Sequence, residues 1–470
     1  YLIDATAAPV CMIAPISSWA AAVSGVVEDY NGFDLFVRAI PYNFYSLLTF
    51  VFIIALILMK FDYGPMRLHE MNARFKNDLY TTGDRADGNN DAIDCNQNGR
   101  VIDLILPVAV LIVTCFAGLV YAGGYWDASG DYYHDFVGAF GNTDAFVALP
   151  WGSLIALVFT IIYFLCRRLI SFKAAMDCLP KGFINMVPAI TILTFATSLK
   201  NMTGLLGGKY FVASVMNSAA GSLFSFLPAI IFLVAGVLSF STGTSWGTFG
   251  ILLPIVTYVF DPASELFIIG VSACLAGAVF GDHCSPISDT TIAACNGQGC
   301  AMKDKFRENF HIAFPAALAS LALILVLTLH ADVTPAEIPP YNLIQIIPYV
   351  LVLIGGIIGI NVFVVLLIGI VSGAVIALAT GATGQTGILA VKALLENMGS
   401  GAAGMFETSM VAILVSAICA LIREYGGFEA LLGWIRKAFR GKRGGQIGMG
   451  LLVGAMDIAT ANNTVAIVMA

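Results

Sequence analysis

Long apolar stretches, separated by short polar segments, make up most of this chain. An apolar run of about 18 residues or more is long enough to cross the hydrocarbon core of a bilayer as a helix. Two apolar stretches, 3–27 and 264–297, are interrupted near their centres. Ten further segments are candidate spans: 43–59, 101–124, 146–166, 183–200, 222–256, 309–329, 343–360, 361–380, 404–422 and 444–470. The segments 222–256 and 444–470 are also interrupted, so we expect an all-α polytopic membrane protein with broken transmembrane helices.

Composition supports this class. Of the 470 residues, 59% are hydrophobic and only 11% are charged, whereas a soluble domain carries roughly 25% charged residues. The chain has no polybasic tail, so its composition does not suggest a nucleic-acid partner. The 10 cysteines are spread singly through the chain, as expected of small apolar residues. The sequence begins at Tyr1 and stops at Ala470 inside an apolar run, so we expect a fragment that lacks sequence at both ends.

The distribution of Lys and Arg orients the predicted spans, because cytoplasmic segments of membrane proteins are enriched in these residues. Four segments are basic and are therefore placed in the cytoplasm: 60–100, 167–181, 303–307 and 423–443. The segments 125–145 and 330–342 contain neither Lys nor Arg and are placed outside. A third outside segment follows Lys200 and contains Lys209, which is a mild exception to the rule.

The charge alternation then predicts re-entrant hairpins. If 222–256 returns the chain to the cytoplasm, the stretch 264–297 must enter and leave on the cytoplasmic side, with its tip near 281–289. By the same reasoning, a hairpin at 3–27 opens outward. Two similar devices of opposite orientation are typical of an inverted repeat. We therefore expect one transporter domain over 1–470, with repeat regions 1–200 and 201–330, additional C-terminal spans over 331–470, and a cytoplasmic loop at 60–100.

The strongest polar cluster is Gly281-Asp-His-Cys-Ser-Pro-Ile-Ser-Asp-Thr-Thr291, which holds two carboxylates and four hydroxyls in an apolar setting. Proline removes a backbone donor and breaks a helix, so carbonyl oxygens become free to bind a ligand. Carboxylate, hydroxyl and carbonyl oxygens suit a hard cation or a proton. Since a charge at mid-membrane costs roughly 2.5–3.5 kcal/mol, this cluster is a candidate functional site.

Three weaker clusters interrupt other apolar stretches. Phe240-Ser-Thr-Gly-Thr-Ser-Trp-Gly-Thr248 is typical of an unwound helix that faces a substrate, although its hydroxyls could instead bond neighbouring helices. Met456-Asp-Ile-Ala-Thr-Ala-Asn-Asn-Thr464 places costly polar groups in the last span. The fourth cluster consists of Asp4, Thr6, Ser17 and Ser18.

Other motifs argue against competing classes. Asp94-Cys-Asn-Gln-Asn-Gly99 begins like a calcium-binding EF-hand loop, but position twelve is Ile105 instead of Glu. His283 beside Cys284 has no spaced partner for a transition-metal site. The scattered histidines form no nucleophile–base arrangement, so we expect no enzyme. The basic segment 428–440 is amphipathic and is expected to lie on the cytoplasmic interface.

The motifs resemble those of the NhaC-type sodium/proton antiporter family. The resemblance covers essentially the whole chain and is carried by Gly243-Thr-Ser-Trp-Gly-Thr248, by the 281–291 cluster and by Asp4-Ala-Thr-Ala-Ala-Pro-Val10. It implies an ion-transporter fold with inverted repeats, re-entrant hairpins and a site between hairpin tips and broken helices. Because members of this family include sodium/proton antiporters, malate/lactate exchangers and amino-acid carriers, the resemblance indicates the class and leaves the substrate open.

The resulting hypothesis is a secondary transporter that exchanges Na+ for H+ by alternating access in the bacterial inner membrane. Asp282 and Asp289 would alternately hold the proton or Na+. The other predicted ligands are Ser285, Ser288, Thr290, Thr244, Ser245, Asp4, Thr6, Asp457 and Asn462. The alternative is Na+-coupled transport of an amino acid or small carboxylate. An ion channel is disfavoured because it needs a continuous ring of filter groups. No cofactor is expected beyond the transported ions, and a homodimer is one expected assembly.

Overall fold

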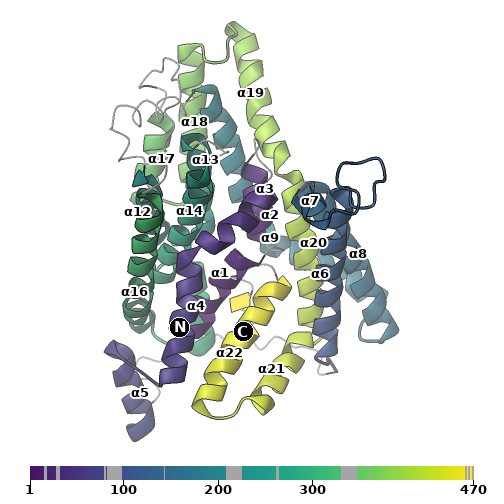
Figure 1. The fold of residues 1–470 in the computed structure, drawn as a ribbon, viewed down its shortest axis with the longest axis vertical. Coiled ribbons are helices and arrows are strands. Elements are labelled where there is room, and N and C mark those ends of the chain that lie inside the picture. Colours follow the sequence, from purple (N-terminus) through teal and green to yellow (C-terminus); the bar gives the residue numbers. More distant parts are fainter. Residues whose placement is uncertain are drawn as a thin grey trace.

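The computed structural model describes residues 1–14, 18–27, 32–78, 81, 98–141, 143–207, 225–260, 264–329, 344, 347–358, 360–460, 463 and 466–467. In this part of the chain all regular structure is helical (Figure 1). The helices are α1 (Leu2–Ile13), α2 (Ser18–Val26), α3 (Gly32–Ala39), η1 (Ile40–Tyr42), α4 (Phe44–Met59), α5 (Gly64–Lys76), α6 (Ile102–Ala122), α7 (Phe136–Gly141), α8 (Ala145–Cys166), α9 (Phe172–Leu205), α12 (Leu227–Thr242), α13 (Ser245–Val259), α14 (Glu265–Cys284), α15 (Asp289–Gln298), α16 (Met302–Thr328), α17 (Ile347–Ile357), α18 (Val362–Thr380), α19 (Gly387–Gly404), α20 (Phe406–Glu424), α21 (Gly427–Ala438) and α22 (Gly441–Thr460).

The helices form a polytopic membrane protein. Seven described helical stretches are long and apolar enough to cross a bilayer, and an eighth is added if the bent pair within α9 is one span. Large apolar side chains on the outer helices are exposed, such as Val113 in α6, Ile162 in α8 and Val371 in α18. In contrast, the apolar window of α14 is 89% buried. We infer that the outer helices face lipid and that α14 is the central helix, which confirms the predicted all-α membrane class.

Helices α12 and α13 form a helical hairpin. Glycine contacts show that α12 runs parallel to α14, because a Cβ on Gly277 would meet Phe232, and one on Gly281 would meet Gly236 and Phe240. Helix α13 runs the other way: its first residue bonds near the end of α14, and Phe260 just beyond it packs on Gly270 near the start of α14. The hairpin tip lies at residues 243–244, between the two helices.

This arrangement corrects the predicted hairpin at 264–297 and the predicted single crossing at 222–256. The hairpin is formed by residues 227–259, whereas α14 alone has the length of a span and is followed by a break at 285–288 and by α15. The charge rule could not separate the two readings, because the segment 257–264 contains no Lys or Arg to show on which side it lies.

The stretch 3–27 is a pair of helices, α1 and α2, that runs past the same region in the opposite direction to α14 and α15. Asp4 contacts Thr291, beyond the break of α14. Further along, Trp19 at the start of α2 stacks on Trp246, near the hairpin tip. From Asp4 to Trp19, the chain therefore passes from the level of α15 to the level of the α12–α13 hairpin tip.

The predicted outward-opening hairpin at 3–27 is consequently wrong. Helix α1 begins beside the start of α16, where Asp4 contacts Lys305. The start of α16 also contacts the basic helix α5, since the Tyr63 hydroxyl donates to the carbonyl oxygen of His311. Helix α1 thus starts at the end of the bundle where the basic helix α5 lies. The stretches 3–27 and 264–297 still run in opposite directions, but each is a broken helix and neither is a hairpin.

Candidate functional site at the hairpin tip

The tip of the α12–α13 hairpin packs directly against the break between α14 and α15. Gly243 ends α12 with φ +68°, a left-handed conformation that favours glycine. A Cβ at this position would lie 2.7 Å from the carbonyl oxygen of Ile287. The Ser285 hydroxyl donates to the carbonyl oxygen of Phe240 over 2.8 Å. The hairpin tip and the break between α14 and α15, which are separated in sequence, therefore meet at one place.

Asp282 and Ser245 form the centre of this junction. The Ser245 hydroxyl donates to Asp282 Oδ2 over 2.9 Å, and both residues are 1% exposed. Asp282 lies in the last turn of α14, and Ser245 is the first residue of α13. A carboxylate in such a setting can hold a proton or, together with hydroxyl and carbonyl oxygens, a small hard cation.

Four helix ends converge on the junction, and their dipoles have opposite effects. Helices α12 and α14 present their C-terminal ends, whose carbonyl groups carry partial negative charge and favour a cation. Helices α13 and α15 present their N-terminal ends, which favour an anion such as a substrate carboxylate. The junction can therefore accommodate a cation, an anionic group, or both side by side.

The remaining predicted residues of this region lie around the same break. The Thr244 hydroxyl caps α13 by accepting from the Gly247 amide over 3.3 Å. Ser288 and Thr290 are buried, and their hydroxyls are 2.8 Å apart. Asp289 is the first residue of α15, but its side chain lies outside the described part, as does all of Asn462. These two assignments stay predictions.

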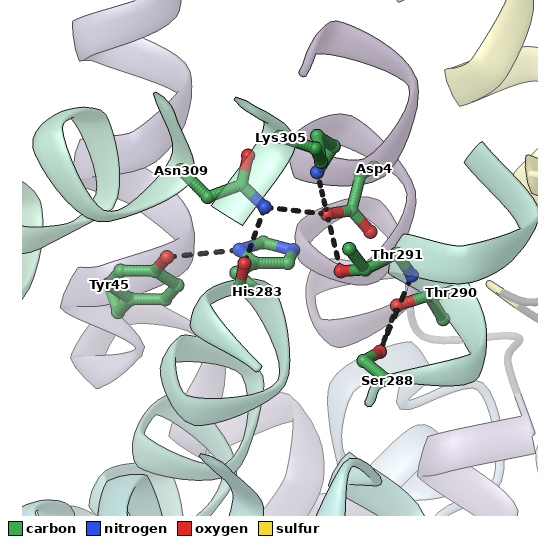
Figure 2. A network of polar contacts seen from close by, with 8 residues as sticks. All are labelled: Asp4, Tyr45, His283, Ser288, Thr290, Thr291, Lys305 and Asn309. Carbon is green, nitrogen blue, oxygen red and sulfur yellow. Dashed lines mark hydrogen bonds and ion pairs between the residues drawn. The ribbon is translucent and has the colours of Figure 1, made fainter. Parts of the chain in front are cut away.

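A second buried network centres on Asp4 (Figure 2). Asp4 Oδ2 accepts from Lys305 Nζ at 2.6 Å, from Asn309 Nδ2 at 3.2 Å and from the Thr291 hydroxyl at 3.3 Å. Asn309 Nδ2 also donates to the carbonyl oxygen of His283, the residue that follows Asp282. The Asp4 network is thus adjacent to the junction. Thr6 is buried in the same helix α1.

Sequence reasoning missed several members of this network. Lys305 was assigned to a cytoplasmic basic run, yet its side chain is only 4% exposed. The charge rule counts a lysine without regard to its burial, so it could not distinguish Lys305 from a surface residue. No sequence feature marks Tyr45, whose hydroxyl lies 2.9 Å from His283 Nδ1. The available clue to Asn309 was its position: it is a polar residue that lies one helical turn after Lys305, at the start of the predicted apolar span 309–329.

Asp457 lies in a third place, between α1 and α22. Its Oδ1 accepts from the Cys11 thiol at 3.2 Å, and both residues are 1% exposed. Asn463 is also fully buried. Among the described residues, no group of three His, Cys, Asp or Glu side chains is arranged to hold a metal ion. The predicted carboxylates Asp282, Asp4 and Asp457 therefore lie in three separate clusters.

Comparison with known protein families assigns the chain to a class. The model of the Na+/H+ antiporter family matches residues 6–331, which include the hairpin, the broken helix α14–α15, all of α2 and all but the first residues of α1. The chain belongs to the Na+/H+ antiporter family. Its membership places it among transporters and agrees with the resemblance seen in the motifs. No solved structure matches.

Bacterial relatives of this antiporter-family chain carry different names. An uncharacterized protein of Haemophilus influenzae is 33% identical over 64% of this chain and 57% of its own length. A Haemophilus influenzae protein described as an uncharacterized Na+/H+ antiporter is 25% identical over 56% of this chain and 57% of its own. The malate-2H+/Na+-lactate antiporter of Bacillus subtilis is 27% identical over 33% of each chain. The chain spans between a third and about half of the length of these relatives.

Proposed function

We propose that this chain forms the ion-exchanging part of a Na+/H+ antiporter of the bacterial inner membrane. The observation that carries the proposal is the buried Asp282 carboxylate at the place where the hairpin tip meets the broken helix. Family membership and the bacterial relatives support the exchange of Na+ for H+.

The proposed cycle uses one carboxylate for two competing ligands. Asp282 binds a proton when the site faces the more acidic side and releases it when Na+ enters from the other side. Ser245 donates to Asp282 in the cation-free state, and its hydroxyl oxygen can turn its lone pairs toward Na+ when the ion arrives. Ser285, Ser288 and Thr244 supply further oxygens around the break. Competition for one carboxylate couples the two fluxes because both ligands cannot bind it together.

The decisive experiment measures Na+-dependent proton movement in inside-out vesicles from a bacterial strain without its own Na+/H+ antiporters. We expect Asp282→Asn to abolish the Na+-dependent signal, because the amide can neither carry a negative charge nor exchange a proton. Asp282→Glu retains the carboxylate and should keep part of the activity. Full activity of Asp282→Asn, with the protein present in the membrane at normal amount, would refute the assignment.

A second candidate is exchange of a small carboxylate coupled to Na+. Two observations favour it: the N-terminal ends of α13 and α15 point toward the junction, and one relative is named as a malate/lactate antiporter. Uptake of radiolabelled malate and lactate into proteoliposomes, with and without a Na+ gradient, separates the candidates. Carboxylate uptake that requires Na+ would favour the second candidate, and Na+/H+ exchange without it would favour the first.

A further inference from the structure

Asp4 is surrounded by the oxygen atoms that a monovalent cation would need. Its Oδ2 accepts three hydrogen bonds, while its Oδ1 is buried without a hydrogen-bond partner among the described residues. The Asn309 Oδ1 atom is likewise buried and without a partner in that part of the chain. The Thr291 hydroxyl adds another oxygen. Carboxylate, amide and hydroxyl oxygens are ligands that hard cations prefer.

The position of a bound cation is taken by an ammonium group. Lys305 Nζ lies 2.6 Å from Asp4 Oδ2, and the two side chains are 4% and 1% exposed. A buried carboxylate ion without a counter-charge is strongly disfavoured, so without Lys305 the Asp4 carboxylate would either take up a proton or bind another cation. The chain supplies the cation itself, on a side chain from α16.

The pair also lies next to the proposed transport site. Asn309 donates both to Asp4 and to the carbonyl oxygen of His283, which follows Asp282. Thr291 belongs to α15, directly after the break. Two buried carboxylates, Asp4 and Asp282, therefore lie in adjoining networks, and Asp4 forms an ion pair with Lys305.

We propose that Lys305 is a tethered cation: its ammonium fills a second monovalent-cation site formed by Asp4, Thr291 and Asn309, and so keeps that site out of ion exchange. This role does not require that Asp282 binds Na+. It assigns to Lys305 the function of limiting the number of carboxylates at which a free cation can bind. A lysine that only holds α1 against α16 would not have this effect.

The test measures thermal unfolding of purified protein in detergent, in matched NaCl and choline chloride. The background is Asp282→Asn, which removes the proposed transport site. We expect no Na+-dependent shift for Asp282→Asn alone. The double variant D282N/K305M should gain a Na+-dependent rise in unfolding temperature of about 2 °C or more, because Na+ then replaces the lost ammonium at Asp4.

Two controls define the gain. D282N/K305R keeps a tethered cation and should show no Na+-dependent rise. D4N/D282N/K305M removes the carboxylate and should also show none. If D282N/K305M cannot be isolated, D282N/K305Q replaces it, since glutamine can still donate to Asp4. A folded D282N/K305M or D282N/K305Q variant without any Na+-dependent rise would overturn the proposal, as would a rise that persists after Asp4→Asn.

The outcome is distinguishable from failure of the proposed function. If wild-type protein shows no Na+/H+ exchange, the Na+ response of D282N/K305M and its loss in D4N/D282N/K305M still report on Asp4 alone. LiCl and KCl in the same assay then show which monovalent cation fits the space left by the ammonium. Lack of a response to all three cations in every Lys305→Met and Lys305→Gln variant contradicts a cation site at Asp4.

Discussion

At the scale of single residues, the junction is defined by one hydrogen bond between a hydroxyl and a carboxylate. Ser245 and Asp282 are 37 positions apart and are both almost fully buried. A hydrogen bond to a charged group contributes about 1.5–3 kcal/mol, more than a bond between neutral groups. The hydroxyl is therefore expected to affect ion binding and not only stability.

We predict that Ser245→Ala raises the Na+ concentration needed for half-maximal exchange by roughly 10- to 100-fold, since 1.4 kcal/mol corresponds to a factor of ten. The measurement is Na+-dependent proton movement in inside-out vesicles at varied Na+. Ser239→Ala is the matched control: Ser239 is equally buried but donates to the carbonyl oxygen of Ala278, so its loss should leave the Na+ dependence unchanged. Equal effects of both substitutions would contradict a ligand role for Ser245.

The sequence was informative about residues that are costly in lipid and uninformative about their partners. Asp282 and Ser245 were recognised because polar residues interrupt apolar runs at those positions, and the structure brings them together. The burial of Lys305 could not be predicted, because a lysine near a span end gives the same signal whether it is buried or exposed. Only the fold shows that Asp4 from α1 reaches it.

At the scale of elements, glycines set how closely α12 approaches α14. A Cβ on Gly281 would lie 2.2 Å from the carbonyl oxygen of Gly236 and 2.7 Å from Ser239 Cβ. A Cβ on Gly236 would lie 3.1 Å from the ring of Phe280 and at an ordinary contact distance of 3.8 Å from the carbonyl oxygen of Gly277. The ring can shift, whereas a backbone carbonyl cannot move without displacing its helix. The two glycines should therefore differ in their tolerance of alanine.

We predict that Gly281→Ala destabilises the protein by about 1–3 kcal/mol or more, while Gly236→Ala costs clearly less. Thermal unfolding in detergent is the measurement. Gly399→Ala is the control, because it lies inside α19 with no atom within 4 Å of an added Cβ and should be neutral or stabilising by up to about 1 kcal/mol. If Gly281→Ala were as stable as Gly399→Ala, the close packing of α12 on α14 would be wrong.

At the scale of the whole molecule, the order of crossings depends on which segment is the hairpin. The contacts show that 227–259 turns back on itself and that α14 descends beside it to the basic end of the bundle. The start of α14 then lies at the end opposite to α5, which is outside if the basic helix α5 is cytoplasmic. The sequence-based reading placed that segment in the cytoplasm.

We predict that a cysteine at Glu265, which is exposed at the start of α14, reacts from outside with a membrane-impermeant maleimide. The substitution is made in a background without the 10 native cysteines. Ser129→Cys, in the exposed loop after α6, is the outside reference, and Ser171→Cys, between the basic residues that precede α9, is the inside reference. Labelling of Glu265→Cys only after the membrane is permeabilised would support the cytoplasmic placement instead.

The all-α membrane class followed from the sequence, because hydropathy reports on the presence of long apolar helices. The sequence predicts ten candidate spans besides the two interrupted stretches, whereas seven described stretches, or eight with the bent pair of α9, are long and apolar enough to cross a bilayer. The sequence could not show which of the two stretches, 222–256 or 264–297, is the hairpin. Either choice places the basic segments on the same side of the membrane, because 257–264 contains no Lys or Arg. The break at 285–288 was expected from Pro286, but a break alone does not show whether the chain continues or returns. That choice is made by the glycine contacts between helices distant in sequence.

The near-contact of the α12 and α14 backbones has a consequence for how ions move. Helices joined so closely through Gly236, Gly277 and Gly281 have little room to slide past one another. Ser245, on the return arm of the hairpin, and Asp282, on α14, therefore belong to one stiff unit. If Asp282 binds the transported ions as proposed, a bound ion would move together with this unit, and opening the site to either solution would require displacement of the unit against the surrounding helices.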